Sequence, residues 1–325
     1  MSRLTIAQIS DSHILADRRG RLRGLEPLPR LERVVARVVQ RIADRNDVDL
    51  VVFTGDQIQD DPAAYPVFLE AIAPIRIPVA FVPGNHDHRE GFALHLLPRQ
   101  EETTRPPATS SSETDPGHRG GPDPSQGPPP GVAAAGAAPA VARPTAGARL
   151  RPRTRLGARL GARPSGPASA PFSPPLYRAL QLGPVRILLL DSLQDGEVHG
   201  RLGAPQLSWI EETLRAMVPG PTLVFVHHPP LPTGIDWLDP HVIEEGDELV
   251  RILVAREVGH LFFGHVHQPM TLERHGLVAV GSAATCFGFG GDGDAPMLLD
   301  GPPGLTWIDV VGDQVRSRVE YLPIS

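Results

Sequence analysis

The chain has 325 residues, of which 41% are hydrophobic and 21% charged, and its formal net charge at pH 7 is −6. This composition is typical of a globular protein with a sizeable core, and the acidic balance argues against bulk electrostatic binding of nucleic acid. The single cysteine, Cys286, excludes intramolecular disulfide bonds and cysteine-based zinc clusters. No apolar run approaches the roughly 20 residues of a transmembrane helix, and the first expected strand starts by Arg3, which leaves no room for a signal peptide. We therefore expect a cytoplasmic protein with no membrane partner.

Short apolar runs and amphipathic stripes alternate through the first part of the chain. Residues 4–9 form an apolar run of strand length, and apolar side chains then recur at steps of three and one through residues 28–42, as on one face of a helix. A second strand is expected at 50–53, a helix at 63–73 and a third strand at 79–82. Strands that alternate with helices predict βαβ units and an α/β fold.

The same alternation returns in the last part of the chain, with a further helix expected at 205–217. The strands expected there are 177–182, 185–190, 223–226, 260–263, 277–280 and 305–311. In folds of this class the ligand lies beyond the carboxyl ends of the strands. The residues that follow each strand are therefore the candidates for function.

Residues 99–176 separate these two parts and differ from them in composition. They are rich in Pro, Gly, Ala and Arg and poor in large apolar side chains, so they cannot bury enough surface to offset the entropy of ordering. We expect a disordered insertion that divides one domain into a first half, 1–98, and a second half, 177–325. Two origins stay open: a flexible tether or partner-binding arm, or a stretch read in a shifted frame that replaces a shorter ordered loop.

Polar clusters follow five of the expected strands. They comprise carboxylate, imidazole and amide side chains within 11–13, 55–56, 84–87, 227–230 and 264–267. Such side chains are the ligands of borderline metals such as Mn, Fe, Zn and Co. Two Asp, one Asn and at least four His exceed the needs of one tetrahedral ion, and a carboxylate can bridge two ions in a hydrolytic site. A glycine that precedes a ligand allows close approach of the backbone.

These motifs resemble those of the calcineurin-like metallophosphoesterases. The matching residues are Asp11-x-His13, Gly55-Asp56, Gly84-Asn85-His86-Asp87, His227 and Gly264-His265-Val266-His267. Their immediate neighbours, such as His228-Pro229-Pro230 and Thr285-Cys286-Phe287, are similar to the bacterial class III cyclic nucleotide phosphodiesterase branch. The resemblance implies a four-layer αββα sandwich of the metallophosphoesterase type, interrupted here by the long disordered insertion.

The resemblance also implies a role for each motif residue. Asp11, His13 and His267 would hold one metal ion. Asn85, His227 and His265 would hold the other, and Asp56 would bridge the two. His86 would be no ligand; it would face the substrate phosphate and donate a proton to the leaving oxygen. Two divalent ions are implied, with iron and manganese expected first and zinc or cobalt as alternatives.

Several assignments near these motifs stay open. His227 is preferred to His228 only by its position in the motif, and either Asp60 or Asp87 could orient His86. Asp87 is expected to act mainly as a structural hydrogen-bond acceptor. We expect His241 to be a surface or satisfied histidine and Cys286 to be a pocket-wall or core residue without nucleophilic function. Residues 288–293 lack the ligand spacing of a calcium loop and are expected to form a flexible turn.

The function implied is hydrolysis of 3′,5′-cyclic nucleotides, cyclic AMP above all, by attack of a metal-bridging hydroxide. A glycerophosphodiesterase or a broad-specificity phosphodiesterase is the alternative, since pocket walls vary freely on one fold. An inactive metal-binding scaffold is a further alternative, which the presence of His86 disfavours. The expected partner is a small phosphodiester substrate and not nucleic acid or membrane, and homo-oligomerisation stays open.

Overall fold

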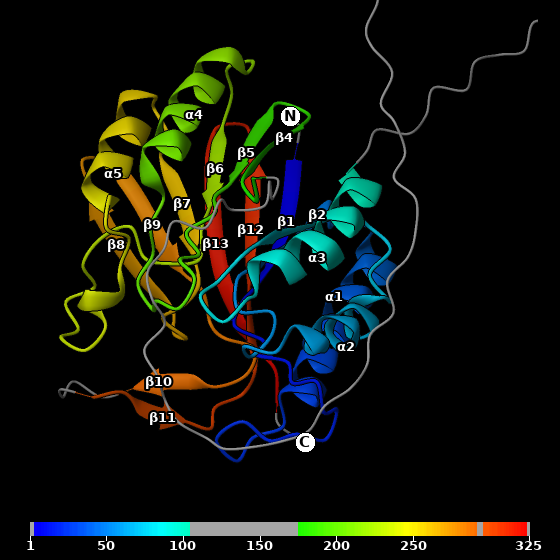
Figure 1. The fold of residues 1–325 in the computed structure, drawn as a ribbon. Helices are drawn as coiled ribbons and strands as arrows, with labels where there is room; N and C mark the ends of the chain where they lie inside the picture. Colours follow the sequence, from blue (N-terminus) through cyan, green and yellow to red (C-terminus); the bar gives the residue numbers. More distant parts are fainter. Residues whose placement is uncertain (1–2, 105–174, 291–294, 324–325) are drawn as a thin grey trace, which may run out of the picture. The chain divides into compact units, whose positions relative to one another are not determined.

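The computed structural model describes residues 3–104, 175–290 and 295–323. Within these residues one sheet has the strand order β13-β12-β1-β2-β3. Strands β1, β2 and β3 are parallel, whereas β12 and β13 are antiparallel additions that bring the end of the chain beside its beginning (Figure 1). The bounds are β1 (Arg3–Ile9), β2 (Leu50–Thr54), β3 (Val79–Val82), β12 (Gly304–Val311) and β13 (Gln314–Tyr321).

A second sheet has the order β4-β5-β6-β7-β9-β8, with a parallel centre and an antiparallel strand at each edge. Its strands are β4 (Arg178–Leu182), β5 (Val185–Leu189), β6 (Thr222–Phe225), β7 (His260–Phe263), β8 (Met270–Arg274) and β9 (Leu277–Gly281). A separate hairpin-like pair, β10 (Gly288–Gly290) and β11 (Met297–Leu299), lies beyond the carboxyl ends of the central strands (Figure 1).

Helices cover the outer face of each sheet. Figure 1 shows α1, α2 and α3 beside the first sheet and α4 and α5 beside the second. Their bounds are α1 (Pro27–Arg45), α2 (Tyr65–Ile72), α3 (Arg89–Thr104), α4 (Gly203–Ala216) and α5 (Gly246–Ala255), with single 3₁₀ turns η1 (Pro62–Ala64) and η2 (Asp239–His241). Helix α1 places a proline in its first turn and ends at Asn46 in the left-handed conformation, both common devices at helix ends.

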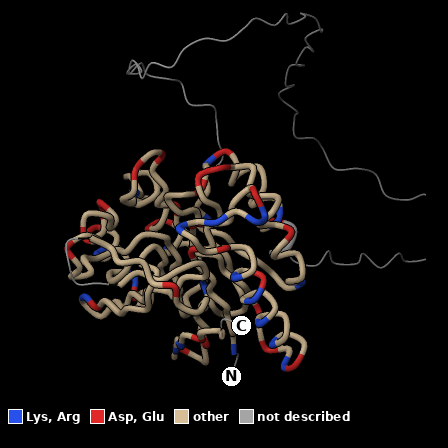
Figure 2. Tube along the Cα trace, turned by 90° about the horizontal axis from the view of Figure 1, so that it is seen from below, with Lys and Arg blue, Asp and Glu red and all other residues tan. Residues whose placement is uncertain are grey.

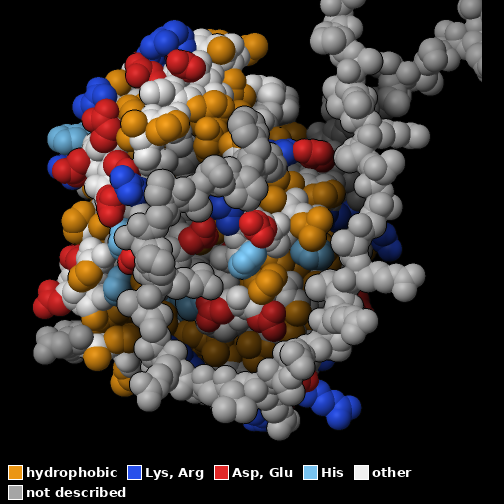
Figure 3. Space-filling model, in the orientation of Figure 1, with side chains coloured by type: hydrophobic (Ala, Val, Ile, Leu, Met, Phe, Trp, Pro, Cys, Tyr) orange, Lys and Arg blue, Asp and Glu red, His pale blue; other side chains and the backbone are white. Residues whose placement is uncertain are grey.

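The surface of the described residues is mixed in charge and in polarity. Acidic and basic positions are interspersed around the chain trace in Figure 2, and apolar side chains lie among the charged ones on the face seen in Figure 3. Among the described residues, no helix combines the length and the apolar character that crossing a bilayer requires.

Three apolar layers account for the order of helices and sheets. Along β1, Ala7 and Ile9 pack toward α1, whereas Leu4 and Ile6 pack toward the second sheet. The other central strands alternate in the same way, so both faces of each strand are buried and their sequences are apolar without interruption. Each sheet therefore has helices on one face and the other sheet on its second face. The expected four-layer αββα sandwich is confirmed.

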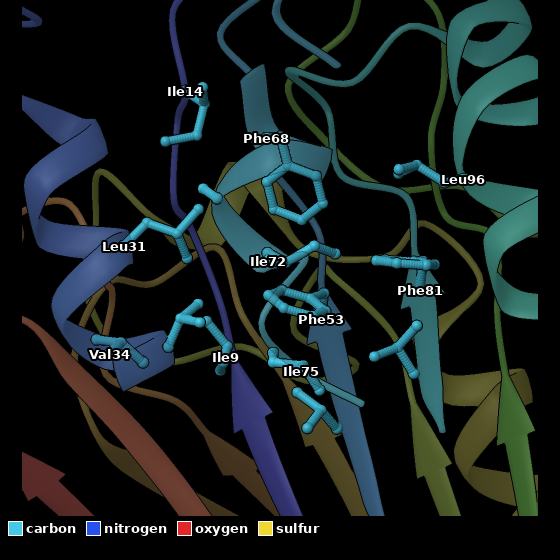
Figure 4. Close-up of a cluster of buried hydrophobic side chains, with 14 of the residues drawn as sticks. Ile9, Ile14, Leu31, Val34, Phe53, Phe68, Ile72, Ile75, Phe81 and Leu96 are labelled. Carbon is cyan, nitrogen blue, oxygen red and sulfur yellow. The ribbon is translucent and has the colours of Figure 1, made fainter. Parts of the chain in front are cut away.

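The layer between the first sheet and its helices is rich in aromatic side chains (Figure 4). The ring centroid of Phe53 on β2 lies 5.4 Å from that of Phe81 on β3 in a stacked arrangement, and 5.2 Å from that of Phe68 on α2 in an edge-to-face arrangement. Leu31 and Val34 on α1 complete this side of the core and are fully buried. These contacts hold the carboxyl ends of β2 and β3, where the polar clusters begin, in a fixed place.

The structure differs from the sequence expectation at the edge of the insertion. The first half was expected to end at residue 98, but α3 continues to Thr104. The side chain of Gln100 is buried and its Oε1 accepts a hydrogen bond from the backbone N–H of Phe81 at 2.6 Å. No helix was expected here from the sequence, because Pro98 is unusual inside a helix and polar residues follow it. Residues 105–174, which make up most of the predicted insertion, lie outside the described residues.

A second difference concerns residues 288–293. Residues Gly288–Gly290 form strand β10 and pair with β11, where a flexible turn was expected. Residues 291–294 lie outside the described residues. The sequence expectation also contained no equivalent of α5, β8 or β13.

Candidate metal centre

The seven predicted ligands lie together where the carboxyl ends of both sheets meet. Each follows a central strand by two to four residues, because a parallel sheet brings these ends to one edge. The first sheet contributes Asp11, His13, Asp56 and Asn85, and the second contributes His227, His265 and His267. The site is therefore assembled from both parts of the chain that flank residues 105–174.

One group within this set comprises Asp11, His13, Asp56 and His267, whose candidate ligand atoms lie within 4.8 Å of one another. Nε2 of His13 lies 3.1 Å from Nε2 of His267, which lies 3.4 Å from Oδ1 of Asp11. Oδ2 of Asp56 lies 3.7 Å from Nε2 of His13. All four side chains are buried. Such convergence of imidazole and carboxylate atoms could hold one metal ion.

A second group adjoins the first through the same carboxylate. Oδ2 of Asp56 lies 3.3 Å from Nε2 of His227. Oδ1 of Asn85 lies 3.1 Å from Nε2 of His227 and 3.1 Å from Nδ1 of His265. A second ion could be held here, and Asp56 lies between the two groups, as expected of a bridging residue.

The histidine tautomers fit a metal role. The Nδ1–H of His227 donates to the carbonyl of Thr54 at 2.8 Å, and the Nδ1–H of His267 donates to the carbonyl of Phe287 at 2.8 Å. The Nδ1 of His13 is paired in the same way with Oε1 of Gln59, at 2.9 Å. These bonds leave the Nε2 lone pairs facing the centre. Metal-binding histidines in proteins are usually held by such a second hydrogen bond.

The electrostatics of the group favour a cation at its centre. Burial lowers the pKa of His13 to about 4 and lowers the pKa of His265 and His267 well below its usual value, so these rings are neutral and can ligate. Burial also raises the pKa of Asp11 to about 7, and its Oδ2 has no hydrogen-bond partner among the described residues. A buried carboxylate oxygen without a donor is costly, and a divalent ion would relieve that cost.

Asp56 and His227 shift each other's pKa, and a metal ion bound at Nε2 of His227 would replace the proton on that nitrogen. Burial by itself raises the pKa of Asp56, but the neighbouring imidazoles, His227 first, outweigh it and lower that pKa well below its usual value. Burial by itself lowers the pKa of His227, but Asp56 outweighs it and raises that pKa to about 9. The carboxylate that would bridge two ions is therefore held in its charged form.

Strained backbone accompanies the ligands. Asp11, His13, Asp56, His265 and His267 all have positive φ angles, of 55°, 47°, 51°, 66° and 53° respectively. Residues other than glycine rarely adopt this region, and such strain concentrates at functional sites. The turns direct successive side chains back across the strand ends toward one centre.

Glycines before the ligands are required by close packing. A Cβ on Gly55 would overlap the imidazole of His227, and Gly55 has a φ of 93°. A Cβ on Gly84 would overlap Oδ1 and the backbone N of Asp56. A Cβ on Gly264 would overlap Oγ of Ser10. The backbone at these glycines therefore lies close to neighbouring groups, as expected, and those groups belong to the adjacent loops that carry candidate ligands.

The choice between His227 and His228 follows from their hydrogen bonds. Both ring nitrogens of His228 have protein partners: Nδ1 lies 2.8 Å from Oγ of Ser192 and Nε2 lies 3.0 Å from the carbonyl of Val198. His228 also lies close to His265, and its ligand atom is within reach of the second group. The neighbours of Nε2 of His227 are instead two other candidate ligands, Asn85 at 3.1 Å and Asp56 at 3.3 Å, which favours His227 as the ligand.

His86 is oriented by Asp60. Its Nδ1 lies 2.8 Å from Oδ1 of Asp60, and Gln59 donates from Nε2 to the other carboxylate oxygen at 2.6 Å. Asp87 instead accepts hydrogen bonds from the backbone of Gly84 and from the hydroxyl of Tyr65. The alternative left open by the sequence is thus decided for Asp60, and Asp87 has the structural contacts expected of it.

A cavity of about 560 Å³ opens beside the two groups. Its walls include five of the seven candidate ligands and His86, together with Arg23, Trp237, His241 and Phe289; the five are His13, Asp56, Asn85, His265 and His267. In the space-filling view, histidine and acidic side chains lie close together among apolar ones on the visible face (Figure 3). His241, expected to be a surface or satisfied histidine, is partly exposed on this cavity wall, and its ring meets that of His265 edge-on at a centroid distance of 6.3 Å.

One polar cluster was missed in the sequence. Asp191 follows β5 and accepts two hydrogen bonds from the guanidinium of Arg89, the shorter at 2.5 Å, while Arg89 also donates to the carbonyl of Leu193 at 2.6 Å. The ion pair joins the two parts of the chain beside the site. A carboxylate directly after a central strand was the signal that could have revealed it.

Cys286 is buried and free of disulfides. Burial raises the pKa of its thiol to about 12, so the thiolate needed for nucleophilic attack is disfavoured. Its backbone carbonyl accepts a hydrogen bond from Arg30 on α1 at 2.9 Å. These contacts agree with the expected wall or core position.

Comparison with known proteins shows what the chain is similar to. Residues 4–119 match the family model described as calcineurin-like phosphoesterase. The chain is 29% identical over 290 residues to an Escherichia coli 3′,5′-cyclic adenosine monophosphate phosphodiesterase, an alignment that covers 89% of this chain and 78% of the relative. It is 25% identical to the Haemophilus influenzae enzyme of the same name, with 98% and 90% covered. A Nostoc 3′,5′-cyclic-nucleotide phosphodiesterase is 23% identical, with 99% and 94% covered.

Solved structures agree on the fold. A dimetal phosphatase from Danio rerio superposes with a TM-score of 0.52 at 12% sequence identity, covering 98% of each chain. At this identity the likeness concerns the fold alone. The motif residues gathered at the strand ends, the family match over residues 4–119 and the relatives over most of the chain make this protein similar to the calcineurin-like phosphoesterases, and among them to cyclic nucleotide phosphodiesterases.

Proposed function

We propose that this protein is a dinuclear metal-dependent phosphodiesterase that hydrolyses 3′,5′-cyclic nucleotides, with cyclic AMP as the first substrate to test. The observation that carries the proposal is the pair of ligand groups that share Asp56 and open into one cavity with His86 on its wall. The names of the relatives support the choice of substrate. The described residues supply each part that phosphodiester hydrolysis by such a site requires.

The ligand assignment follows the two groups. Asp11, His13 and His267 would hold one ion. Asn85, His227 and His265 would hold the other, with Asp56 shared. Neutral imidazoles with carboxylate and amide oxygens suit iron or manganese first, and zinc or cobalt as alternatives. Two such ions, when bound, neutralise the charge of the phosphodiester and lower the pKa of water so that hydroxide attacks near neutral pH.

His86 is the residue proposed to donate a proton to the leaving oxygen. Burial by itself lowers the pKa of His86, but Asp56 and the hydrogen bond with Asp60 outweigh it and raise that pKa. With Nδ1 engaged by Asp60, the protonated ring presents Nε2–H as its remaining donor. A proton delivered to the departing ribose oxygen avoids release of an alkoxide.

The test is the hydrolysis rate of manganese-loaded protein on cyclic AMP, bis(p-nitrophenyl) phosphate and p-nitrophenyl phosphate. Turnover of cyclic AMP is the expected result. Hydrolysis of bis(p-nitrophenyl) phosphate but not of cyclic AMP would support the metal chemistry and would indicate that the substrate is another diester, such as a glycerophosphodiester. If protein with two bound ions hydrolyses none of the three substrates, the proposal is overturned in favour of a metal-binding scaffold.

A variant pair links turnover to the centre. Asp56→Ala removes the shared carboxylate, so we expect both metal content and turnover to fall together by at least tenfold, as for the loss of a metal ligand. Asp313→Ala is the matched control because Asp313 is exposed in the turn between β12 and β13. Intact metal content and turnover in Asp56→Ala would show that the ligand assignment is wrong.

A further inference from the structure

Two aromatic side chains from distant parts of the chain meet on the cavity wall. Phe289 lies on β10, and Trp237 lies in the segment between β6 and α5. Their ring centroids are 5.3 Å apart and their planes are inclined by 71°. The ring of Phe289 also lies 4.5 Å from the imidazole of His267. One aromatic ring therefore separates Trp237 from the metal centre.

Phe289 belongs to none of the three apolar cores, and Trp237 packs against the core of the second sheet on one side only. Trp237 and Phe289 are only half-buried, and both line the cavity of about 560 Å³. Phe287 provides the contrast: it is 5% exposed and lies parallel to the imidazole of His13 at 5.5 Å, so it packs against the ligands. A half-exposed Phe and Trp that face a catalytic cavity lose apolar contact with water when a ligand covers them.

The indole N–H of Trp237 is a second observation. Its Nε1 is buried and has no hydrogen-bond partner among the described residues. Buried donors in proteins nearly always have an acceptor, so one without a partner needs an explanation. Because the atom is shielded as the structure stands, a ligand acceptor reaches it only if the wall shifts on binding, whereas the ring that lines the cavity already offers a surface for stacking.

The shape of the wall favours a planar heteroaromatic group. Two rings inclined by 71° form a corner in which a flat ring can stack on one face and meet the other edge-on. An aliphatic alcohol such as glycerol has no planar face to use this corner. A cavity of this volume also lies within the range that holds molecules the size of a mononucleotide.

We propose that Trp237 and Phe289 form the subsite for the nucleobase of the substrate. The inference rests on the proposed function, because it places the phosphate at the metal centre and the base one ring farther along the wall. Stacking on these rings supplies affinity for the base. The corner thus selects nucleotide diesters over aliphatic diesters.

The experiment compares two ligands that differ only in the base. Adenosine 5′-monophosphate and ribose 5-phosphate are titrated by calorimetry into manganese-loaded wild-type protein, Trp237→Ala, Phe289→Leu and Trp237→Phe. We expect the wild-type protein to bind the nucleotide about tenfold or more tightly than the sugar phosphate, as for one base–aromatic stack. Trp237→Ala and Phe289→Leu should each lose most of this ratio with the affinity for ribose 5-phosphate unchanged, and Trp237→Phe should retain most of it.

Fluorescence gives a readout that is independent of affinity. The chain has three tryptophans, and Trp307 is fully buried against the helices of the first sheet. We expect the nucleotide to quench emission in the wild-type protein and in Trp209→Phe, the matched control, because Trp209 packs against Tyr177 at a centroid distance of 4.7 Å. The quenching should be absent in Trp237→Phe although the nucleotide still binds.

The possible failures are distinguishable. If the nucleotide binds more tightly than the sugar phosphate and neither Trp237→Ala nor Phe289→Leu changes the ratio, the base lies elsewhere and the subsite is overturned alone. If wild-type protein that hydrolyses cyclic AMP binds adenosine 5′-monophosphate and ribose 5-phosphate with equal affinity, the subsite alone is likewise overturned. If the two affinities are equal in protein that hydrolyses bis(p-nitrophenyl) phosphate but not cyclic AMP, both the proposed substrate and the subsite are overturned.

Discussion

Gly84 is the residue at which backbone space matters most for the metal centre. A Cβ at this position would overlap the carboxylate and the backbone N of Asp56. We therefore expect Gly84→Ala to displace Asp56 and to reduce bound metal at least tenfold, measured by elemental analysis after dialysis. Gly259→Ala is the control, because Gly259 has no atom within 4 Å of an added Cβ and no positive φ. Equal metal content in the two variants would contradict the close packing described here.

Asp60 is the residue whose effect should be confined to the rate. It touches His86 and Gln59 and lies outside both ligand groups. In Asp60→Asn the orientation and charge of His86 change, so we expect kcat for cyclic AMP to fall about 10- to 100-fold, within the usual contribution of a general acid. Metal content and melting temperature should stay unchanged. A parallel fall in metal content would show that Asp60 supports the ligands instead of the proton donor.

At the scale of elements, the end of α1 is attached to the first sheet by a buried cation. Arg41 is buried, lies over the ring of Trp307 at 4.1 Å and donates two hydrogen bonds of 2.9 Å to Asp47, which precedes β2. These bonds are the main cause that lowers the pKa of Asp47. The pair should therefore stabilise the fold at pH values above the usual carboxyl pKa, near 4.

Asp47→Asn tests this attachment. We expect the free energy of unfolding at pH 7 to fall by about 2 kcal/mol, less than for a fully buried pair because Asp47 is partly exposed. The difference from the wild-type protein should vanish as the pH falls below 4 through the folded pKa of Asp47, since both proteins then carry an uncharged side chain. Urea unfolding at pH 7 and pH 3 measures this difference in the free energy of unfolding, and Asp44→Asn, a change at an exposed position, is the control. A difference that is independent of pH would show that the charge is not the cause.

At the scale of the whole molecule, the described residues form the three cores and the site without residues 105–174. The chain on either side of that segment is already close, because Nη2 of Arg178 on β4 lies 2.7 Å from Oε1 of Glu101 on α3. We expect replacement of residues 105–174 by about eight Gly and Ser residues, which can span such a gap, to leave the melting temperature within a few degrees and the metal content unchanged. A large gain in melting temperature and rate would favour the shifted-frame origin, and loss of assembly or of a partner would favour a functional arm.

The sequence predicted the elements that have simple periodicity. The apolar runs at 4–9, 50–53 and 79–82 became β1, β2 and β3, and the stripe at 28–42 became α1, because burial on one or two faces leaves a direct pattern. Helix α3 was missed although Phe92, Leu96 and Leu97 are buried at helical spacing, because Pro98 interrupts the pattern and polar residues follow it. The strand β10 was missed because a Gly-rich segment has no strand propensity of its own.

By itself the sequence determined which chemistry this protein carries, because strand ends are local features and the Asp, Asn and His residues that follow them are read directly from the chain. Only the tertiary structure decided how that chemistry is arranged. It placed Nε2 of His227 beside Asn85 and Asp56, whereas the nitrogens of His228 bond to Ser192 and Val198, and it paired His86 with Asp60 instead of Asp87. It also brought Trp237 to Phe289. These choices depend on distances between segments far apart in the chain, which no local pattern records.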